Sequence, residues 1–114
     1  MDADEIKAMY RDMCQMPFVI RRYTGASGSR TKTDCNVTGH ARLYSGKELI
    51  GTIVQGDLAV IVLVDDLVAG SFTLPITTFD KVVIDGKEYA ILAPIGQRKA
   101  LDSTLIACEL QARG

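Results

Sequence analysis

After Pro17 the chain consists of short apolar runs separated by turn-forming residues, and this patterning limits the possible folds more than any other feature. Residues 18–24 are rich in aromatic and β-branched side chains, which favour strands. Residues 35–44 alternate: small or apolar residues occupy the odd positions and mostly polar residues the even ones. Such alternation is typical of a strand that is buried on one face.

The second half of the chain continues this pattern. Residues 49–54 and 58–64 are apolar runs divided by Gln55-Gly56-Asp57, and residues 65–70 resemble one helical turn closed by glycine. Residues 81–92 predict a hairpin, because Asp85-Gly86 suits a tight turn with positive φ. A last strand is expected over 103–112. One helix followed by about six short strands predicts a single, mainly β domain over residues 1–114, a small antiparallel β-barrel or sandwich with one N-terminal α-helix.

The N-terminal helix is expected over residues 1–16. Apolar residues recur there at spacings of three and four, as on one face of an amphipathic helix, and Pro17 is expected to end the helix. The residues of this stripe are Ile6, Met9, Tyr10 and Met13. Two interpretations are open: the stripe packs on the chain's own core, or it binds a partner, since methionine adapts to irregular surfaces.

Residues 25–33 consist of small and polar residues with two cations, which predicts a mobile loop. A Walker-type phosphate loop is excluded, because Thr31 stands where glycine must precede Lys32-Thr33. The loop residues best suited to contact a channel or a partner are Gly25, Ser27, Gly28, Ser29, Arg30 and Lys32.

The formal net charge of −1 argues against a protein whose main partner is the nucleic-acid backbone. The apolar runs are too short to span a bilayer, and acidic residues stand where a signal peptide would be basic, so no membrane association is expected. Three widely spaced cysteines predict reduced, mostly buried thiols of a cytosolic product.

Charge is unevenly divided along the chain. Residues 17–47 carry six cations and one acid, residues 1–16 carry two cations and four acids, and residues 48–114 carry five cations and nine acids. This division fits either a solvated surface or a basic face that meets an acidic face on another copy of the chain.

Candidate catalytic groups are few. His40 lies on the strand face opposite Cys35, so the two are expected to point apart rather than form a dyad. Asp65-Asp66 fits a solvated capping pair better than a metal site, and Asp57 and Asp80 stand beside turn signals and are expected as turn residues. No set of nucleophile, base and oxyanion donor is recognisable. The sequence therefore predicts no enzyme, no cofactor and no metal.

An ordered series of motifs runs through the middle and end of the chain. These motifs are Tyr44, Glu48-Leu49, Gly51-Thr52, Gln55-Gly56-Asp57 and Ile84-Asp85-Gly86-Lys87-Glu88-Tyr89. By this order and spacing, residues 40–112 resemble the small neck proteins of long-tailed phages and prophages, the family of head-tail joining, head-completion or stopper proteins. In one departure, that family commonly has Gly-Asp before its hairpin strand, where this chain has Phe79-Asp80.

The resemblance implies a small barrel that assembles into a homo-oligomeric ring below the portal. There it would close the filled head, retain packaged DNA and dock the tail, with portal, adaptor and tail proteins as partners and DNA as a transient contact. The implied location is the virion neck, and the host cytoplasm during assembly. No catalytic residue and no cofactor are implied.

Within this role, the loop over residues 25–33 is expected to face the channel or an adjacent ring, with Arg30 and Lys32 touching DNA. The helix stripe, together with Arg42 and Tyr44, is the expected interface. Two alternatives stay open. One is a tail-completion or tail-terminator protein of the same particle, because fold does not separate these roles. The other is a small cytosolic hydrolase or ligand-binding barrel.

Overall fold

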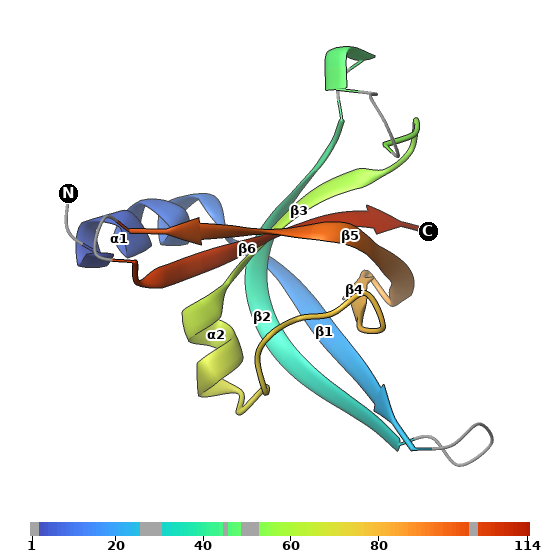
Figure 1. Ribbon diagram of the computed structural model, residues 1–114, viewed down its shortest axis with the longest axis horizontal. Coiled ribbons are helices and arrows are strands. Elements are labelled where there is room, and N and C mark those ends of the chain that lie inside the picture. The colour runs from blue at the N-terminus through green and yellow to red at the C-terminus, as the bar shows by residue number, and fades with distance from the viewer. Residues whose placement is uncertain (1–2, 26–30, 45, 49–52, 101–102) are drawn as a thin grey trace.

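The computed structural model describes all residues except 1–2, 26–30, 45, 49–52 and 101–102. Within the described residues the chain forms two α-helices, one short 3₁₀ helix and six strands (Figure 1). In chain order these are α1 (Ala3–Met13), β1 (Met16–Thr24), β2 (Thr31–Leu43), η1 (Gly46–Glu48), β3 (Leu58–Leu63), α2 (Val64–Ala69), β4 (Lys81–Ile84), β5 (Lys87–Lys99) and β6 (Leu105–Arg113).

The strands close into a barrel in the order β1-β2-β3-β6-β5-β4, and each pair of neighbours is antiparallel. The prediction of a mainly β antiparallel barrel or sandwich with one N-terminal helix is therefore confirmed, and of the two the structure is a barrel. Closure pairs each strand on both sides along part of its length, which leaves few free sheet edges.

Alternate residues of the strands fill the barrel interior. In β2 the predicted alternation holds for Cys35, Val37 and Gly39, which are all buried. It fails at Leu43, which is 65% exposed because the end of β2 continues past the body of the barrel toward η1 (Figure 1). Gly39 is required at its position, since a Cβ there would lie 2.4 Å from the carbonyl oxygen of Ile61.

The helix α2 and the segment after it close one end of the barrel. α2 follows β3 without a loop, and its Leu67 is fully buried in the core together with Phe72 and Ile76. The Gly70 N–H donates to the carbonyl of Asp66, so this is the glycine-closed turn that the sequence predicted.

The helix α1 packs on a second, smaller cluster on the outside of the barrel, against β3 and β6. It ends at Met13, so the prediction of a helix through residue 16 was too long. Met16 and Pro17 belong to β1. A proline is tolerated there because β4 pairs only with Val19–Arg21, which leaves Pro17 without a ladder partner on that side.

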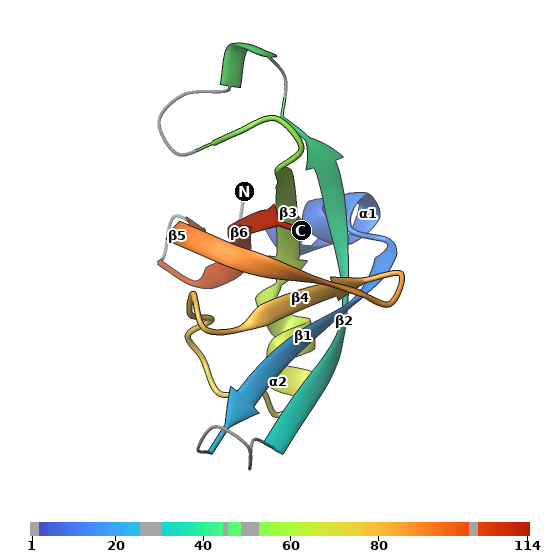
Figure 2. The ribbon, with the colours of Figure 1, turned by 90° about the vertical axis from the view of Figure 1, so that its right-hand side faces the viewer.

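The hairpin of β1 and β2 extends beyond the barrel. β4 pairs with β1 only at Val19–Arg21, and β3 pairs with β2 only from Gly39 to Leu43. In the described ladders, residues 22–24 and 31–33 therefore pair only with each other. We call these six residues the distal hairpin, and both views show it projecting from the body of the protein (Figure 1 and Figure 2).

Candidate interaction surfaces

The base of the distal hairpin is tied to the barrel by a charge cluster. Arg21 Nε donates to Asp34 at 2.8 Å, and its NH1 donates to Glu88 at 2.8 Å. The Tyr23 hydroxyl also donates to Glu88. The hydrogen bonds from Tyr23 and Arg21 lower the pKa of Glu88, and the bond from Arg21 lowers the pKa of Asp34. These contacts join β1, β2 and β5 at the point where the hairpin leaves the barrel.

A second cluster fixes the turn that precedes β4. Asp80 is 1% exposed and accepts two hydrogen bonds of 2.8 Å from the guanidinium of Arg22. Arg22 also donates to the backbone carbonyls of Thr73 and Pro75, and its guanidinium lies 4.3 Å from the centre of the Phe72 ring. We call this arrangement the Asp80 clamp. It holds the whole segment between α2 and β4 against the base of the hairpin.

A third cluster fixes the turn that precedes β3. Asp57 is 1% exposed and accepts hydrogen bonds from Arg113 at 2.9 Å, from Gln111 at 2.8 Å and from the backbone N–H of Val54 at 3.0 Å. Arg113 is the main reason that the pKa of Asp57 lies well below its usual range. The Gln55-Gly56-Asp57 turn is thereby bonded to the last strand.

Asp66 joins three elements rather than standing in solvent. It accepts bonds from the N–H and the hydroxyl of Thr38 at 3.0 and 2.9 Å, and from Arg11 at 3.0 Å. Burial raises the pKa of Asp66, but the bonds from Thr38 and Arg11 outweigh it and leave the pKa lowered. The prediction of a solvated pair holds for Asp65, which is exposed beside Lys7 at 3.4 Å, and is wrong for Asp66.

These ion pairs bear on how the uneven charge distribution along the sequence is interpreted. Arg21 and Arg22 come from the basic segment 17–47, and they pair with Glu88 and Asp80 of the acidic segment 48–114. Part of the segregation seen along the sequence is therefore neutralised inside one chain. The exposed cations of the basic segment that the structure describes are Lys32, Arg42 and Lys47.

The predicted loop is shorter than expected. Thr31–Thr33 belong to β2, so Lys32 is an exposed strand residue opposite Tyr23 rather than a loop residue. Gly25 directly follows β1 with a φ of 99°, a backbone conformation that favours glycine. The other predicted loop contacts, Ser27, Gly28, Ser29 and Arg30, lie outside the described residues.

The apolar stripe of α1 divides between two environments. Ile6 and Tyr10 pack on the small cluster of Cys14, Leu63, Ala100, Ile106 and Ala107. Met9 and Met13 remain 57% and 40% exposed. Core packing therefore accounts for half of the stripe, and the two methionines form an apolar surface that faces solvent.

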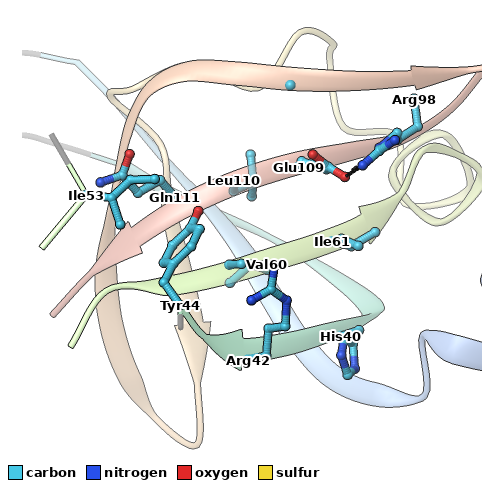
Figure 3. A pocket seen from close by; sticks show the side chains of 12 residues that line it. His40, Arg42, Tyr44, Ile53, Val60, Ile61, Arg98, Glu109, Leu110 and Gln111 are labelled. Carbon is cyan, nitrogen blue, oxygen red and sulfur yellow. Dashed lines mark hydrogen bonds and ion pairs between the residues drawn. The ribbon is translucent and has the colours of Figure 1, made fainter. Parts of the chain in front are cut away.

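A groove of about 440 Å³ runs over the outer face of β2, β3 and β6 (Figure 3). The predicted interface residues Arg42 and Tyr44 line it together with His40 on β2, and the Arg42 guanidinium lies 5.7 Å from the centre of the Tyr44 ring. At the other end, Arg98 forms an ion pair with Glu109. The structure thus brings Arg42 and Tyr44 together on one surface.

A second hollow of about 340 Å³ adjoins this groove and reaches α1. We call it the methionine pocket; its lining residues are Met9, Tyr10, Met13, Ile61, Arg98 and Glu109. Ile61, Arg98 and Glu109 line both hollows. The exposed methionines of α1 are therefore continuous with the groove that contains Arg42 and Tyr44.

The candidate catalytic groups are separated. Cys35 lies in the core, whereas His40 lines the outer groove, so the two point apart as predicted. Cys14, Cys35 and Cys108 are free and buried, and burial raises the pKa of each thiol. Among the described residues, no group of three or more His, Cys, Asp or Glu side chains could hold a metal ion. In the same part of the chain, no helix is long and apolar enough to cross a membrane.

Sequence reasoning missed the buried aspartates. It identified Asp57 and Asp80 as turn residues, and each does accept a backbone N–H within its turn. Their arginine partners lie 56 and 58 residues away along the chain. No local pattern indicates a partner at that distance, so the burial of these carboxylates was not predictable.

No model of a known protein family matches the chain, and no curated protein matches it either. The function is therefore argued from the residues of this chain and their geometry.

Proposed function

We propose that this protein is a structural component of the neck of a long-tailed phage or prophage particle. In this role it forms a ring below the portal, closes the filled head, retains packaged DNA and docks the tail. The observation that carries the proposal is a small closed barrel from which one hairpin projects. In the proposed ring the barrel is the body, and the hairpin is the arm that reaches a neighbouring ring or the channel.

Two of the motifs behind the resemblance have structural roles in this chain. Asp57 bonds the Gln55-Gly56-Asp57 turn to β6, and Asp85-Gly86 forms the β4–β5 turn with φ values of 52° and 79°. Chains that share these motifs are therefore expected to share the barrel. Partner choice is expected to depend on exposed surfaces instead, above all the distal hairpin and the methionine pocket.

The closed barrel also limits how copies can associate. Addition of a strand from a neighbour requires a free sheet edge, and in the described ladders β1 beyond Arg21, β2 before Gly39 and β5 after Ala90 pair on one side only. β3, β4 and β6 are paired on both sides along most of their length, so contacts between copies are expected mainly through side chains on the barrel surface. The hairpin then remains available for the channel or for another ring.

The charges suit a passage for DNA. Arg21 and Arg22, at the base of the hairpin, are held by carboxylates of the same chain. Arginines held in this way are less able to bind phosphates, and the formal net charge is −1. Few strong phosphate contacts allow DNA to slide, whereas a basic lumen would hold its backbone.

Separated heads and tails of the parent phage or prophage provide the test of location. We expect the protein in DNA-filled heads, at the vertex that receives the tail, when both fractions are examined by mass spectrometry and immunogold labelling. Detection in free tails alone would assign it to tail completion. Absence from both fractions would contradict a role in the virion.

A further inference from the structure

Phe79 is an exposed aromatic side chain on a fixed turn. It is 85% exposed and directly precedes the buried Asp80. The Asp80 N–H donates to the carbonyl of Thr77 at 3.1 Å, and the Phe79 N–H donates to the Thr77 hydroxyl at 3.3 Å. The Thr77 N–H in turn donates to Asp80 at 2.8 Å. The turn is therefore closed by its own hydrogen bonds.

The Asp80 clamp makes this turn rigid with respect to the barrel. Arg22 binds Asp80 as well as the carbonyls of Thr73 and Pro75, so the segment that carries Phe79 is attached to β1 at three points. A turn that is held in advance loses little backbone conformational freedom on binding. Aromatic residues, phenylalanine among them, are enriched at protein interfaces. Phe79 has the properties of an interface anchor.

The methionine pocket has the chemistry to receive an aromatic ring. Met9 and Met13 offer flexible thioethers that make favourable contacts with aromatic rings, and Tyr10 offers a ring face. Ile61 forms part of its lining on the barrel side. Burial of the Phe79 ring there would remove apolar surface of both partners from water, which is favourable in proportion to the area buried.

Phe79 and the methionine pocket lie on different sides of the protein. In both views α1 is separated from the segment that leads into β4 by the width of the barrel (Figure 1 and Figure 2). One chain therefore cannot fill its own pocket. We propose that Phe79 of one copy inserts into the methionine pocket of a second copy.

Charges beside the two surfaces are complementary. Lys81 follows Phe79 by two residues, at the first position of β4. On α1, Asp12 is three residues from Met9, so the two are neighbours on the helix surface. Insertion of Phe79 would bring the Lys81 cation toward the Asp12 side of the pocket, whose own charged lining residues, Arg98 and Glu109, are paired with each other. Contact between two Phe79 turns is disfavoured, because each turn is followed by Lys81 and the two cations would repel each other.

This contact is heterologous, because an anchor on one side of the chain meets a pocket on another side. Such contacts generate rings when the rotation closes and filaments when it does not. The inference deepens the proposed function, on which it rests for the expectation that the ring closes. The contact itself can be tested on the purified protein alone.

The test uses two variants that each lose one half of the contact. Phe79→Ser keeps the pocket, and Met9→Asp keeps the anchor. By sedimentation velocity up to about 1 mM, we expect wild-type protein to self-associate and each variant to do so more weakly, by roughly 30-fold or more. Mixed together, the variants retain one intact contact and are expected to form a 1:1 dimer that does not grow further.

Matched controls separate the contact from general effects. Val68→Ser removes another exposed apolar side chain, 61% exposed on α2, and is expected to associate as wild type does. Circular dichroism melts should match wild type for each variant; Met13→Asp replaces Met9→Asp if the latter lowers the melting temperature. A wild-type protein that stays monomeric at about 1 mM overturns the contact. The contact is also overturned if either single variant associates as strongly as wild type, or if the mixture of the two variants stays monomeric.

The contact and the proposed function can fail separately. A protein located in the neck whose variants associate as wild type does would keep the function and refute the Phe79 contact. A complementing mixture from a protein absent from heads and tails would keep the contact and refute the neck role.

Discussion

Replacement of Asp57 by alanine is expected to lower the free energy of unfolding by roughly 2–4 kcal/mol. The substitution removes the carboxylate that accepts hydrogen bonds from the Gln111 amide, the Val54 N–H and Arg113. The cost stays below that of a wholly buried pair, because the Arg113 side chain is 41% exposed and water can reach it. Urea unfolding followed by circular dichroism measures the change.

The same cluster predicts a dependence of stability on acid. The pKa of Asp57 is lower in the folded protein than in the unfolded chain, so its ionised form stabilises the fold at pH values above about 4. That contribution declines as the pH falls below about 4 toward the folded-state pKa. The stability lost on acidification should therefore be smaller in Asp57→Asn than in wild type. Asp85→Asn, in an exposed turn, is the control. Equal costs for Asp57→Ala and for Asp65→Ala, at an exposed position of α2, would contradict the structural role of Asp57.

Shortening the distal hairpin is expected to abolish DNA retention without unfolding the barrel. The variant replaces residues 24–31 by an Asn-Gly turn between Tyr23 and Lys32, which face each other in the register. Unfolding free energy should change by less than about 1 kcal/mol, since the described residues that are removed are exposed. Every copy in a ring carries the shortened hairpin, so the yield of infectious, DNA-filled particles should fall by roughly 100-fold or more.

A variant of unchanged length separates the effect of hairpin length from the effect of hairpin charge. Arg30→Ser with Lys32→Ser keeps the hairpin and removes two cations. If DNA retention depends on the length of the hairpin, particles with this double substitution are filled and retain DNA nearly as wild-type particles do, whereas particles with the shortened hairpin do not. Shortened particles that keep their DNA, as measured by packaged DNA per head, would contradict the role of the hairpin.

The sequence predicted the parts of the fold that depend on local pattern. Asp85-Gly86 supplied the positive φ values of the β4–β5 turn, and the alternation through Cys35 and Val37 matched the buried face of β2. The strand character of Thr31–Thr33 was missed, because these residues are exposed and carry no apolar alternation. Cross-strand pairing with β1 defines them as strand, and a local pattern does not record such pairing.

The candidate surfaces were predictable in part. The helical period placed Met9 and Tyr10 on one stripe, yet only the packing of α1 on the barrel shows that Tyr10 is half-buried while Met9 is exposed. No pattern in the sequence indicated that Phe79 could be an interface anchor, because a single aromatic residue near a turn is common. The turn that carries Phe79 is held by Arg22, which is 58 residues from Asp80 in the chain.

The most direct test of the neck assignment is deletion of this gene in its parent phage or prophage, followed by electron microscopy of the lysate. The proposal predicts emptied heads beside free, complete tails, with joined particles restored by the gene in trans. Full heads beside unfinished tails would contradict head closure and assign the protein to tail completion. Intact infectious particles would contradict any structural role in the virion.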